Sequence, residues 1–275
     1  MTPFQYIILG LIQGATEFIP ISSSAHLVLF PWLLHWPAPG LAVDAALHAG
    51  TLIALLVYFR RDWLAMIVSL FQKSDPMNPN FRRRELLYVV IGCIPAAAVA
   101  LKFDKHFKQF SDPHAMPSAP FYIAIFVAAG ALLLWAAERV GKRRYDLKHL
   151  GPFDAVVIGL CQALALFPGF SRSGSSIAGG LFMGLTREDA ARFSFLMSAP
   201  LIAAACAKSL LDLHKSGIPH SELVGIICGI VAAAVSGYLC IGVLLSYLRR
   251  NSSMLFVYYR YALAAAIVAI YLFRG

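Results

Sequence analysis

The chain has 275 residues, of which 59% are hydrophobic and 13% are charged. A soluble domain carries about 25% charged residues, and with a mean hydropathy of +0.71 this chain has too few polar residues to cover a water-soluble globule. The composition excludes a soluble enzyme, a disordered chain and a disulfide scaffold, and it predicts a polytopic membrane protein. The net charge of +9 comes from short basic runs between apolar stretches, which set membrane topology and do not form a nucleic-acid-binding face.

The apolar stretches follow one another in two similar series. A helix needs about 20 apolar residues to cross the hydrocarbon core. The first apolar region, residues 4–34, is interrupted by Glu17, Pro20 and Ser22–Ser24, and segments of spanning length follow it at 41–59, 86–103 and 121–138. The second region, residues 153–186, is interrupted at Pro168–Gly169 and Ser171–Ser176, and further spanning segments follow at 191–211, 222–247 and 255–273.

We predict that each interrupted region forms two half-helices joined by a polar turn. Irregular backbone at membrane depth is stable only where protein or a wet cavity surrounds it. The two turns are therefore the places where a functional site is expected.

The basic residues indicate how the chain is oriented. One side of the predicted topology collects fifteen of them: Arg60, Arg61, Lys73, Arg82, Arg83, Arg84, Arg139, Lys142, Arg143, Arg144, Lys148, Arg187, Arg192, Arg249 and Arg250. The other side collects five: Lys102, Lys105, Lys108, Lys215 and Arg274. The richer side should be cytoplasmic, and the chain then alternates without conflict if residues 4–34 re-enter from outside and residues 153–186 from the cytoplasm.

The two interrupted regions also resemble each other. Gly10-Leu11-x-Gln13 recurs as Gly159-Leu160-x-Gln162, and Phe18-x-Pro20 with Ser22–Ser24 recurs as Phe167-Pro168 with Ser171 and Ser173, after a gap of one residue. Three spans lie between the copies, so the second copy is inverted, and such repeats hold their site near the midplane between broken helices. We predict an all-α membrane protein with six full transmembrane helices and two re-entrant hairpins. It forms one domain, 1–275, with repeat halves at about 1–110 and 150–275.

The first turn gathers candidate catalytic groups. Gln13 and Glu17 project from one face of the first half-helix, and a carboxylate at membrane depth is a functional candidate by default. Three serines and His26 follow Pro20, more than helix capping needs, and a histidine can act as acid, base or nucleophile near neutral pH. The alternatives are that Glu17 caps the turn or pairs with a base only to hold the fold, and that His26 is a packing residue.

The second turn favours an anion. Ser171, Arg172, Ser173 and Ser176 lie at the start of a half-helix, where free N–H groups and the helix dipole attract negative charge, and the Arg172 fork suits phosphate oxygens. The alternative is a structural pair between Arg172 and Glu17, with the serines as caps.

Other familiar sites are absent from the sequence. It contains no nucleotide-binding GxxxxGK[ST] and no HExxH motif. His48 and Asp44 form another pair at i and i+4, which we interpret as a packing hydrogen bond beside the site.

The two turns resemble the motifs of one family. Residues 13–26 resemble the (E/Q)xxxE and Ser-Ser-x-x-His segment of the bacterial undecaprenyl-diphosphate phosphatases, the bacitracin-resistance family, and residues 168–176 resemble its PGxSRSxxT motif. Ser176 stands where the family usually has Thr and keeps the hydroxyl. Gln13 occupies the slot that takes Glu or Gln, which leaves one carboxylate fewer for a metal.

The resemblance implies hydrolysis of undecaprenyl diphosphate to the monophosphate and phosphate, with recycling of the lipid carrier of cell-wall synthesis and bacitracin resistance. A divalent cation, Mg²⁺ or Ca²⁺, would be held by Glu17 with help from Gln13, because both cations prefer oxygen ligands. Ser23 or His26 would deliver the attack, as nucleophile or by activating serine or water. Arg172 would stabilise the diphosphate, and Gln13, Ser171, Ser173 and Ser176 would contact it.

The alternative from another class is a transporter or lipid translocase, because inverted repeats with broken helices are also a transporter architecture. In either case we expect a multi-pass protein of the bacterial plasma membrane with membrane lipids as neighbours and no nucleic-acid partner. The site should open to the periplasmic or outer side. The sequence leaves the oligomeric state open, a homodimer included.

Overall fold

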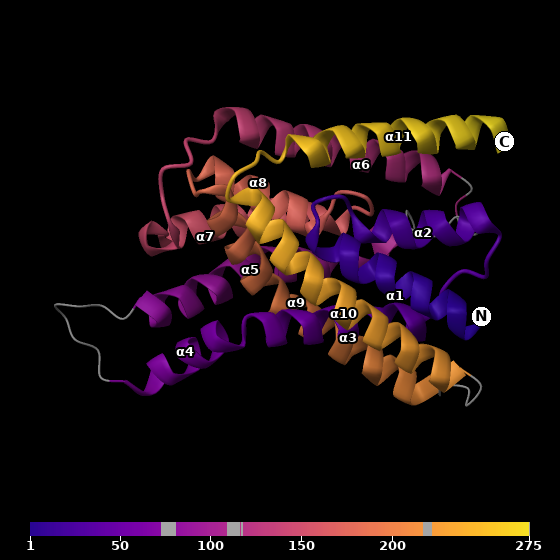
Figure 1. The fold of residues 1–275 in the computed structure, drawn as a ribbon, viewed down its shortest axis with the longest axis horizontal. Coiled ribbons are helices and arrows are strands. Elements are labelled where there is room, and N and C mark those ends of the chain that lie inside the picture. The colour runs from indigo at the N-terminus through magenta and orange to yellow at the C-terminus, as the bar shows by residue number, and fades with distance from the viewer. Residues whose placement is uncertain (73–80, 109–115, 117, 217–221, 275) are drawn as a thin grey trace.

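The computed structural model describes residues 1–72, 81–108, 116, 118–216 and 222–274 (Figure 1). Five of the described helices are long and apolar enough to cross a membrane: α5 (Phe81–Lys108), α6 (Ala119–Val140), α9 (Arg187–Ser216), α10 (Leu223–Leu248) and α11 (Met254–Arg274). A bent pair, α3 (Leu41–Tyr58) and α4 (Arg60–Phe71), makes six if it counts as one span. The predicted all-α, polytopic class is confirmed. Lys73 of the predicted basic side lies outside the described residues.

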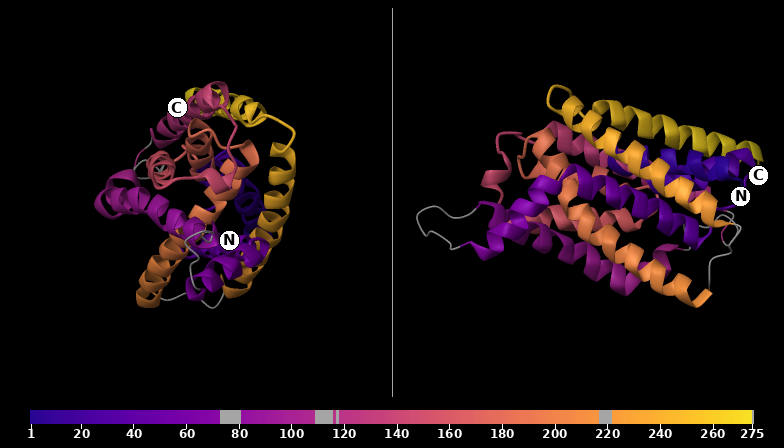
Figure 2. Two further views of the ribbon diagram at one scale, coloured as in Figure 1. Left: turned by 90° about the vertical axis from the view of Figure 1, so that its left-hand side faces the viewer. Right: turned by 60° about the horizontal axis from the view of Figure 1, so that its bottom comes forward.

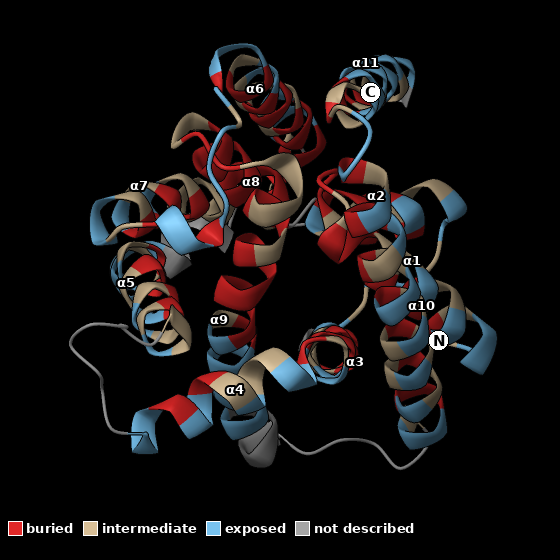
Figure 3. Ribbon diagram, turned by 60° about the vertical axis from the view of Figure 1, so that its left-hand side comes forward, coloured by how far each residue is buried: buried red, intermediate tan, exposed pale blue. Residues whose placement is uncertain are grey.

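Helix α4 was not predicted. It turns by 71° from α3 after Phe59, and Figure 3 shows α3 end-on with α4 running across it. Asp62 near its start accepts hydrogen bonds from Arg82 at 2.9 Å and Arg192 at 2.5 Å, which fasten α4 to α5 and α9. The search for long apolar segments missed this helix because it begins with three charged residues, Arg60, Arg61 and Asp62.

The two interrupted regions each form two short helices around a turn. The first comprises α1 (Pro3–Phe18) and α2 (Ser23–Leu34); the second comprises α7 (Pro152–Ala163), the 3₁₀ turn η3 (Leu164–Leu166) and α8 (Arg172–Phe182). A further 3₁₀ turn, η2 (Leu147–His149), precedes α7. Ser22 and Ser171 cap α2 and α8 in nearly the same backbone conformation, with φ of 77° and 74°. Positive φ is uncommon outside glycine, so the two turns share a distinctive shape.

Equivalent glycines let the hairpins approach long helices. A Cβ on Gly10 of α1 would lie 2.4 Å from the Gly229 oxygen of α10, and one on Gly159 of α7 would lie 2.2 Å from the Gly92 oxygen of α5. In both contacts backbone lies against backbone. The end-on view in Figure 2 shows α10 along one side of the molecule with the first hairpin beside it.

Helix α8 lies in the largest apolar core. Its residues from Ser173 to Leu181 are all buried, and α6, α7 and α9 pack around it (Figure 3). Its glycines, serines and alanine leave room for these neighbours. The core thereby fixes the start of α8, and with it Arg172.

Candidate active site

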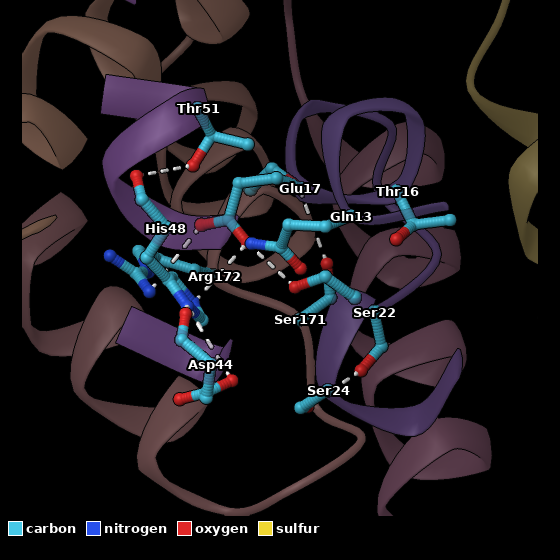
Figure 4. Close-up of polar contacts among 12 residues, drawn as sticks. Gln13, Thr16, Glu17, Ser22, Ser24, Asp44, His48, Thr51, Ser171 and Arg172 are labelled. Atoms are coloured by element: carbon cyan, nitrogen blue, oxygen red, sulfur yellow. Dashed lines mark hydrogen bonds and ion pairs between the residues drawn. The ribbon is translucent and has the colours of Figure 1, made fainter. Parts of the chain in front are cut away.

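Glu17 is the centre of a buried polar cluster (Figure 4). It lies in the last turn of α1, and its Oε2 accepts a hydrogen bond from Ser23 Oγ at 2.6 Å and from Gln13 Nε2 at 3.1 Å. Gln13 comes from one turn earlier on α1, and Ser23 from the start of α2 after the Pro20 turn. The first hairpin thus brings a carboxylate, an amide and a hydroxyl together.

Arg172 joins this cluster from the second hairpin. Its Nη2 lies 3.4 Å from Glu17 Oε1, so the two interrupted regions meet in an ion pair. The turns are also tied reciprocally: the Gly169 N–H donates to Ser24 Oγ at 3.2 Å, and Ser173 Oγ donates to the Ile19 carbonyl at 3.3 Å. Glu17 and Arg172 therefore lie in one site, as expected from the sequence.

His48 of α3 is the third contributor. Its Nε2 is 4.0 Å from Glu17 Oε2, and its Nδ1 donates to the Asp44 carbonyl at 2.8 Å. Side-chain exposure rises from 3% at Glu17 through 20% at His48 to 52% at Asp44, so this face leads from the buried carboxylate to the surface. The hydrogen bond to Asp44 fits the sequence interpretation, but that interpretation missed the contact with Glu17, because nothing in the spacing relates α3 to the hairpin.

His26 is placed differently. Its Nδ1 donates to the Ser22 carbonyl at 2.7 Å, and its Nε2 lies 2.7 Å from the Tyr259 hydroxyl of α11. The two rings stack with centroids 5.9 Å apart. Both ring nitrogens are therefore engaged away from Glu17 and Arg172.

The serines of the second turn have internal partners. Ser171 Oγ accepts from the Gly174 N–H at 3.1 Å, which caps α8. Ser176 Oγ donates to the Arg172 carbonyl at 2.7 Å and lies 2.5 Å from Ser194 Oγ of α9. Without substrate, Arg172 pairs with Glu17 and Ser171 caps α8, which is the structural role that the sequence analysis gave as the alternative to anion binding. Ser171 and Ser173 flank Arg172, whereas Ser176 lies in the α8–α9 contact.

Arg260 is a buried residue of the site region that sequence reasoning left without a role. It is fully buried in α11, and its guanidinium donates to the carbonyls of Val127 at 3.1 Å, Gly169 at 3.1 Å and Phe170 at 2.9 Å. Within the part of the chain that the structure describes, its Nη1 has no hydrogen-bond partner. An arginine within an apolar span was the signal that could have identified it.

The donor set for a cation is small but of suitable chemistry. Among the described residues no group of three or more His, Cys, Asp or Glu side chains is placed to hold a metal. Gln13 Oε1, however, is buried beside the Glu17 carboxylate and accepts no hydrogen bond from the residues that the structure describes. Two oxygen donors of this kind fit a hard cation that keeps several waters, such as Mg²⁺.

Comparison with known proteins gives one family. Residues 6–266 match the bacitracin resistance protein BacA family. The undecaprenyl-diphosphatase of Moorella thermoacetica is 44% identical over 274 residues, and that of Geobacter metallireducens is 40% identical; each alignment covers the whole of both chains. The undecaprenyl-diphosphatase of Thermodesulfovibrio yellowstonii is 43% identical over 99% of this chain and 98% of its own.

Proposed function

The chain belongs to the bacitracin resistance protein BacA family, and from this premise we propose that Glu17, Ser23 and Arg172 form the active site of an undecaprenyl-diphosphatase. The enzyme hydrolyses undecaprenyl diphosphate to undecaprenyl phosphate and inorganic phosphate, which recycles the lipid carrier of cell-wall synthesis and confers bacitracin resistance. The observation that supports this site is the contact of the Glu17 carboxylate with both Ser23 and Arg172.

Arg172 binds the diphosphate. Its planar fork can hold two phosphate oxygens at once, and it stands at the first residue of α8, where the helix dipole also favours negative charge. In the substrate complex Arg172 exchanges part of its contact with Glu17 for the phosphate. Ser171 and Ser173 flank it and supply hydroxyls to the same oxygens, whereas Ser176, whose Oγ is bonded to the Arg172 carbonyl and to Ser194, holds the start of α8 against α9.

Ser23 is the nucleophile. A hydroxyl 2.6 Å from a carboxylate has the geometry of a nucleophile hydrogen-bonded to its base. Ser23 Oγ bonds to the terminal phosphorus while the bond from that phosphorus to the bridging oxygen breaks, undecaprenyl phosphate leaves, and Glu17 takes the serine proton. Water then attacks the phosphoserine, Ser23 is restored, and inorganic phosphate is released. His26, held between Ser22 and Tyr259, positions the first turn of α2.

A divalent cation belongs beside this machinery. Glu17 and the Oε1 of Gln13 would hold it, and when bound it would neutralise charge on the diphosphate. Glu17 would then have two roles, as a ligand of the cation and as the acceptor of the Ser23 proton.

The arrangement of the chain in the membrane follows from the same features. The matched φ values of Ser22 and Ser171, the paired glycine contacts and the reciprocal bonds between the turns support an inverted repeat of two re-entrant hairpins. Exposure increases from Glu17 toward Asp44, and Asp44 lies near the start of α3, at the end of the bundle opposite the end of α6 (Figure 1). This supports a site in the plasma membrane that opens to the outer side.

The test is phosphate release by the purified full chain in detergent. We expect release from undecaprenyl diphosphate by the parent, and trapping of label on the protein when a substrate labelled in the terminal phosphate is quenched with acid. Ser23→Ala should abolish both, whereas His26→Gln should still trap label. Label on the Ser23→Ala protein would contradict Ser23 as the nucleophile, and absence of phosphate release from the folded parent would favour a transporter.

A further inference from the structure

Two neighbouring residues of α11, Tyr259 and Arg260, each contact one of the two active-site turns. The Tyr259 hydroxyl lies 2.7 Å from Nε2 of His26, at the start of α2. Arg260 Nη2 donates to the carbonyls of Gly169 at 3.1 Å and Phe170 at 2.9 Å, in the second turn. Helix α11 therefore bridges the two interrupted regions from a third part of the chain.

Both turns need such support because each contains a strained residue. Ser22 and Ser171 have φ angles of 77° and 74°, in the left-handed range that residues other than glycine seldom adopt. Backbone of this kind persists only where the surrounding contacts hold it in place. In the second turn Arg260 supplies those contacts, to the carbonyls of the two residues that precede Ser171.

In the first turn the support reaches the backbone through His26. Its Nδ1 lies 2.7 Å from the Ser22 carbonyl oxygen, which can only accept, so Nδ1 carries the proton. In the neutral ring Nε2 is then the acceptor, and the Tyr259 hydroxyl donates to it. The buried imidazole also stacks on the rings of Tyr259 and Phe30, with centroids 5.9 Å and 6.5 Å away. A chain of two hydrogen bonds therefore runs from Tyr259 to the Ser22 carbonyl.

The Ser22 carbonyl belongs to the peptide bond that joins Ser22 to Ser23. Because a peptide unit is planar, a contact that fixes its oxygen also fixes the nitrogen of Ser23 and the direction in which the Ser23 side chain leaves the backbone. Ser23 Oγ lies 2.6 Å from Glu17 Oε2. A change in the orientation of this peptide would therefore move the hydroxyl that attacks phosphorus.

We infer that Tyr259 is a positioning residue for the Ser23 hydroxyl and that it acts through His26. The inference rests on the proposed function, in which Ser23 is the nucleophile. It assigns the two neighbours on α11 to different parts of the reaction, Tyr259 to phosphoryl transfer onto Ser23 and Arg260 to the turn that binds the diphosphate. Loss of the Tyr259 hydroxyl should therefore lower kcat and leave KM unchanged, whereas replacement of Arg260 should raise KM.

The experiment measures steady-state phosphate release and single-turnover trapping of label, for the purified full chain in detergent with undecaprenyl diphosphate labelled in its terminal phosphate. A misplacement of about 1 Å at a reacting group costs on the order of 10²-fold, so Tyr259→Phe should lower kcat and the rate constant for trapping by about 10- to 100-fold. Tyr258→Phe, at the adjacent exposed tyrosine, should match the parent. With protein in excess and saturating, the trapping rate constant does not depend on the folded fraction, so loss of folded protein cannot imitate the effect.

A double-mutant cycle tests the route through His26. In the His26→Ala background, Tyr259→Phe should cause no further loss, because the chain of hydrogen bonds is already broken. Equal kinetics of Tyr259→Phe and Tyr258→Phe would overturn the inference, as would the full loss in the His26→Ala background, or a raised KM with a parental trapping rate. Absence of phosphate release by the folded parent chain would overturn the proposed function and this inference with it.

Discussion

The Glu17 carboxylate receives groups from three separate stretches of the chain: Gln13 and Ser23 from its own hairpin, His48 from α3, and Arg172 from the second hairpin. Each contact depends on the length and shape of the side chain as well as on its charge or polarity. Substitutions that keep charge or polarity but change that geometry are therefore the informative ones.

Arg172→Lys should not preserve activity. Lysine offers a point charge where the guanidinium offers two parallel donors, and removal of one preorganised charge stabiliser costs at least about 10²-fold in turnover. Phosphate release and the melting temperature are measured together. Arg250→Lys, an exposed position away from the site, is the matched control and should leave turnover unchanged; a folded Arg172→Ala protein with near-parental phosphate release would remove Arg172 from the site.

A chelator should abolish activity if Glu17 and Gln13 hold the cation. Glu17→Gln removes the charged ligand, so activity should fall and any remainder should need more metal. Gln13→Glu adds a carboxylate on the same face of α1 and should lower the metal concentration for half-activity or leave it unchanged. Metal titration of the phosphate-release rate measures both. Full activity of the parent protein in chelator would contradict the cation, although the phosphatase assignment would stand.

Arg260 should act as a positioning residue for the Pro168–Ser173 turn. The guanidinium reaches the Val127 carbonyl from Nε and the Gly169 and Phe170 carbonyls from Nη2, whereas Lys has all its donors on one nitrogen. We therefore expect Arg260→Lys to leave one of these carbonyls without a donor, and a buried unsatisfied group costs about 1–3 kcal/mol. We expect a lower melting temperature, a higher KM and weaker inhibition by inorganic pyrophosphate, because Arg172 lies in this turn. A folded Arg260→Lys protein with unchanged KM and inhibition would limit Arg260 to a structural role.

At the scale of elements, the hairpins depend on close helix contacts. Helices α1 and α7 carry glycines at equivalent positions, and each glycine meets the backbone of a long helix from the other half of the chain. A backbone oxygen cannot move aside as a side chain can. Any Cβ placed there must separate the two helices.

Gly10→Ala and Gly159→Ala should each destabilise the protein by about 1–3 kcal/mol, the range for overpacking. The reason is the approach of the new Cβ to within 2.4 Å and 2.2 Å of a carbonyl oxygen. Thermal unfolding in detergent measures the effect. Gly242→Ala in α10 is the control, since its Cβ would meet nothing closer than 3.5 Å; equal melting temperatures for the three variants would contradict the close contacts.

At the scale of the molecule, the basic loops at one end of the helix bundle predict that this end faces the cytoplasm. The α2–α3 connection and the connection after α6 lie at opposite ends of the bundle (Figure 1). Ala38 of the first and Arg144 of the second are both exposed. In whole cells a membrane-impermeant maleimide should label Ala38→Cys but label Arg144→Cys only after the membrane is disrupted. The parent chain controls for its five native cysteines. Labelling of Arg144→Cys but not of Ala38→Cys in whole cells would leave the proposed reaction unchanged and place the opening of the active site on the cytoplasmic side.

The sequence alone determined the membrane class, the position of the long helices and the two turns that carry the polar residues. These properties depend on local composition: apolar length predicts a span, and proline with serines predicts a break. The same local signals missed α4, because three charged residues at its start lowered its hydropathy. Its orientation depends on contacts of Asp62 with Arg82 of α5 and Arg192 of α9, which are distant in the sequence.

The tertiary structure decided which polar residues meet. His48 of α3 contacts Glu17, whereas His26, which follows the serines of the first turn in the sequence, is bonded to Tyr259 of α11. Arg260 supports a turn that lies far from it along the chain. Side-chain spacing on one helix is fixed by its 3.6-residue period, but contact between helices depends on how the whole bundle packs, and a single sequence carries no local signal for that.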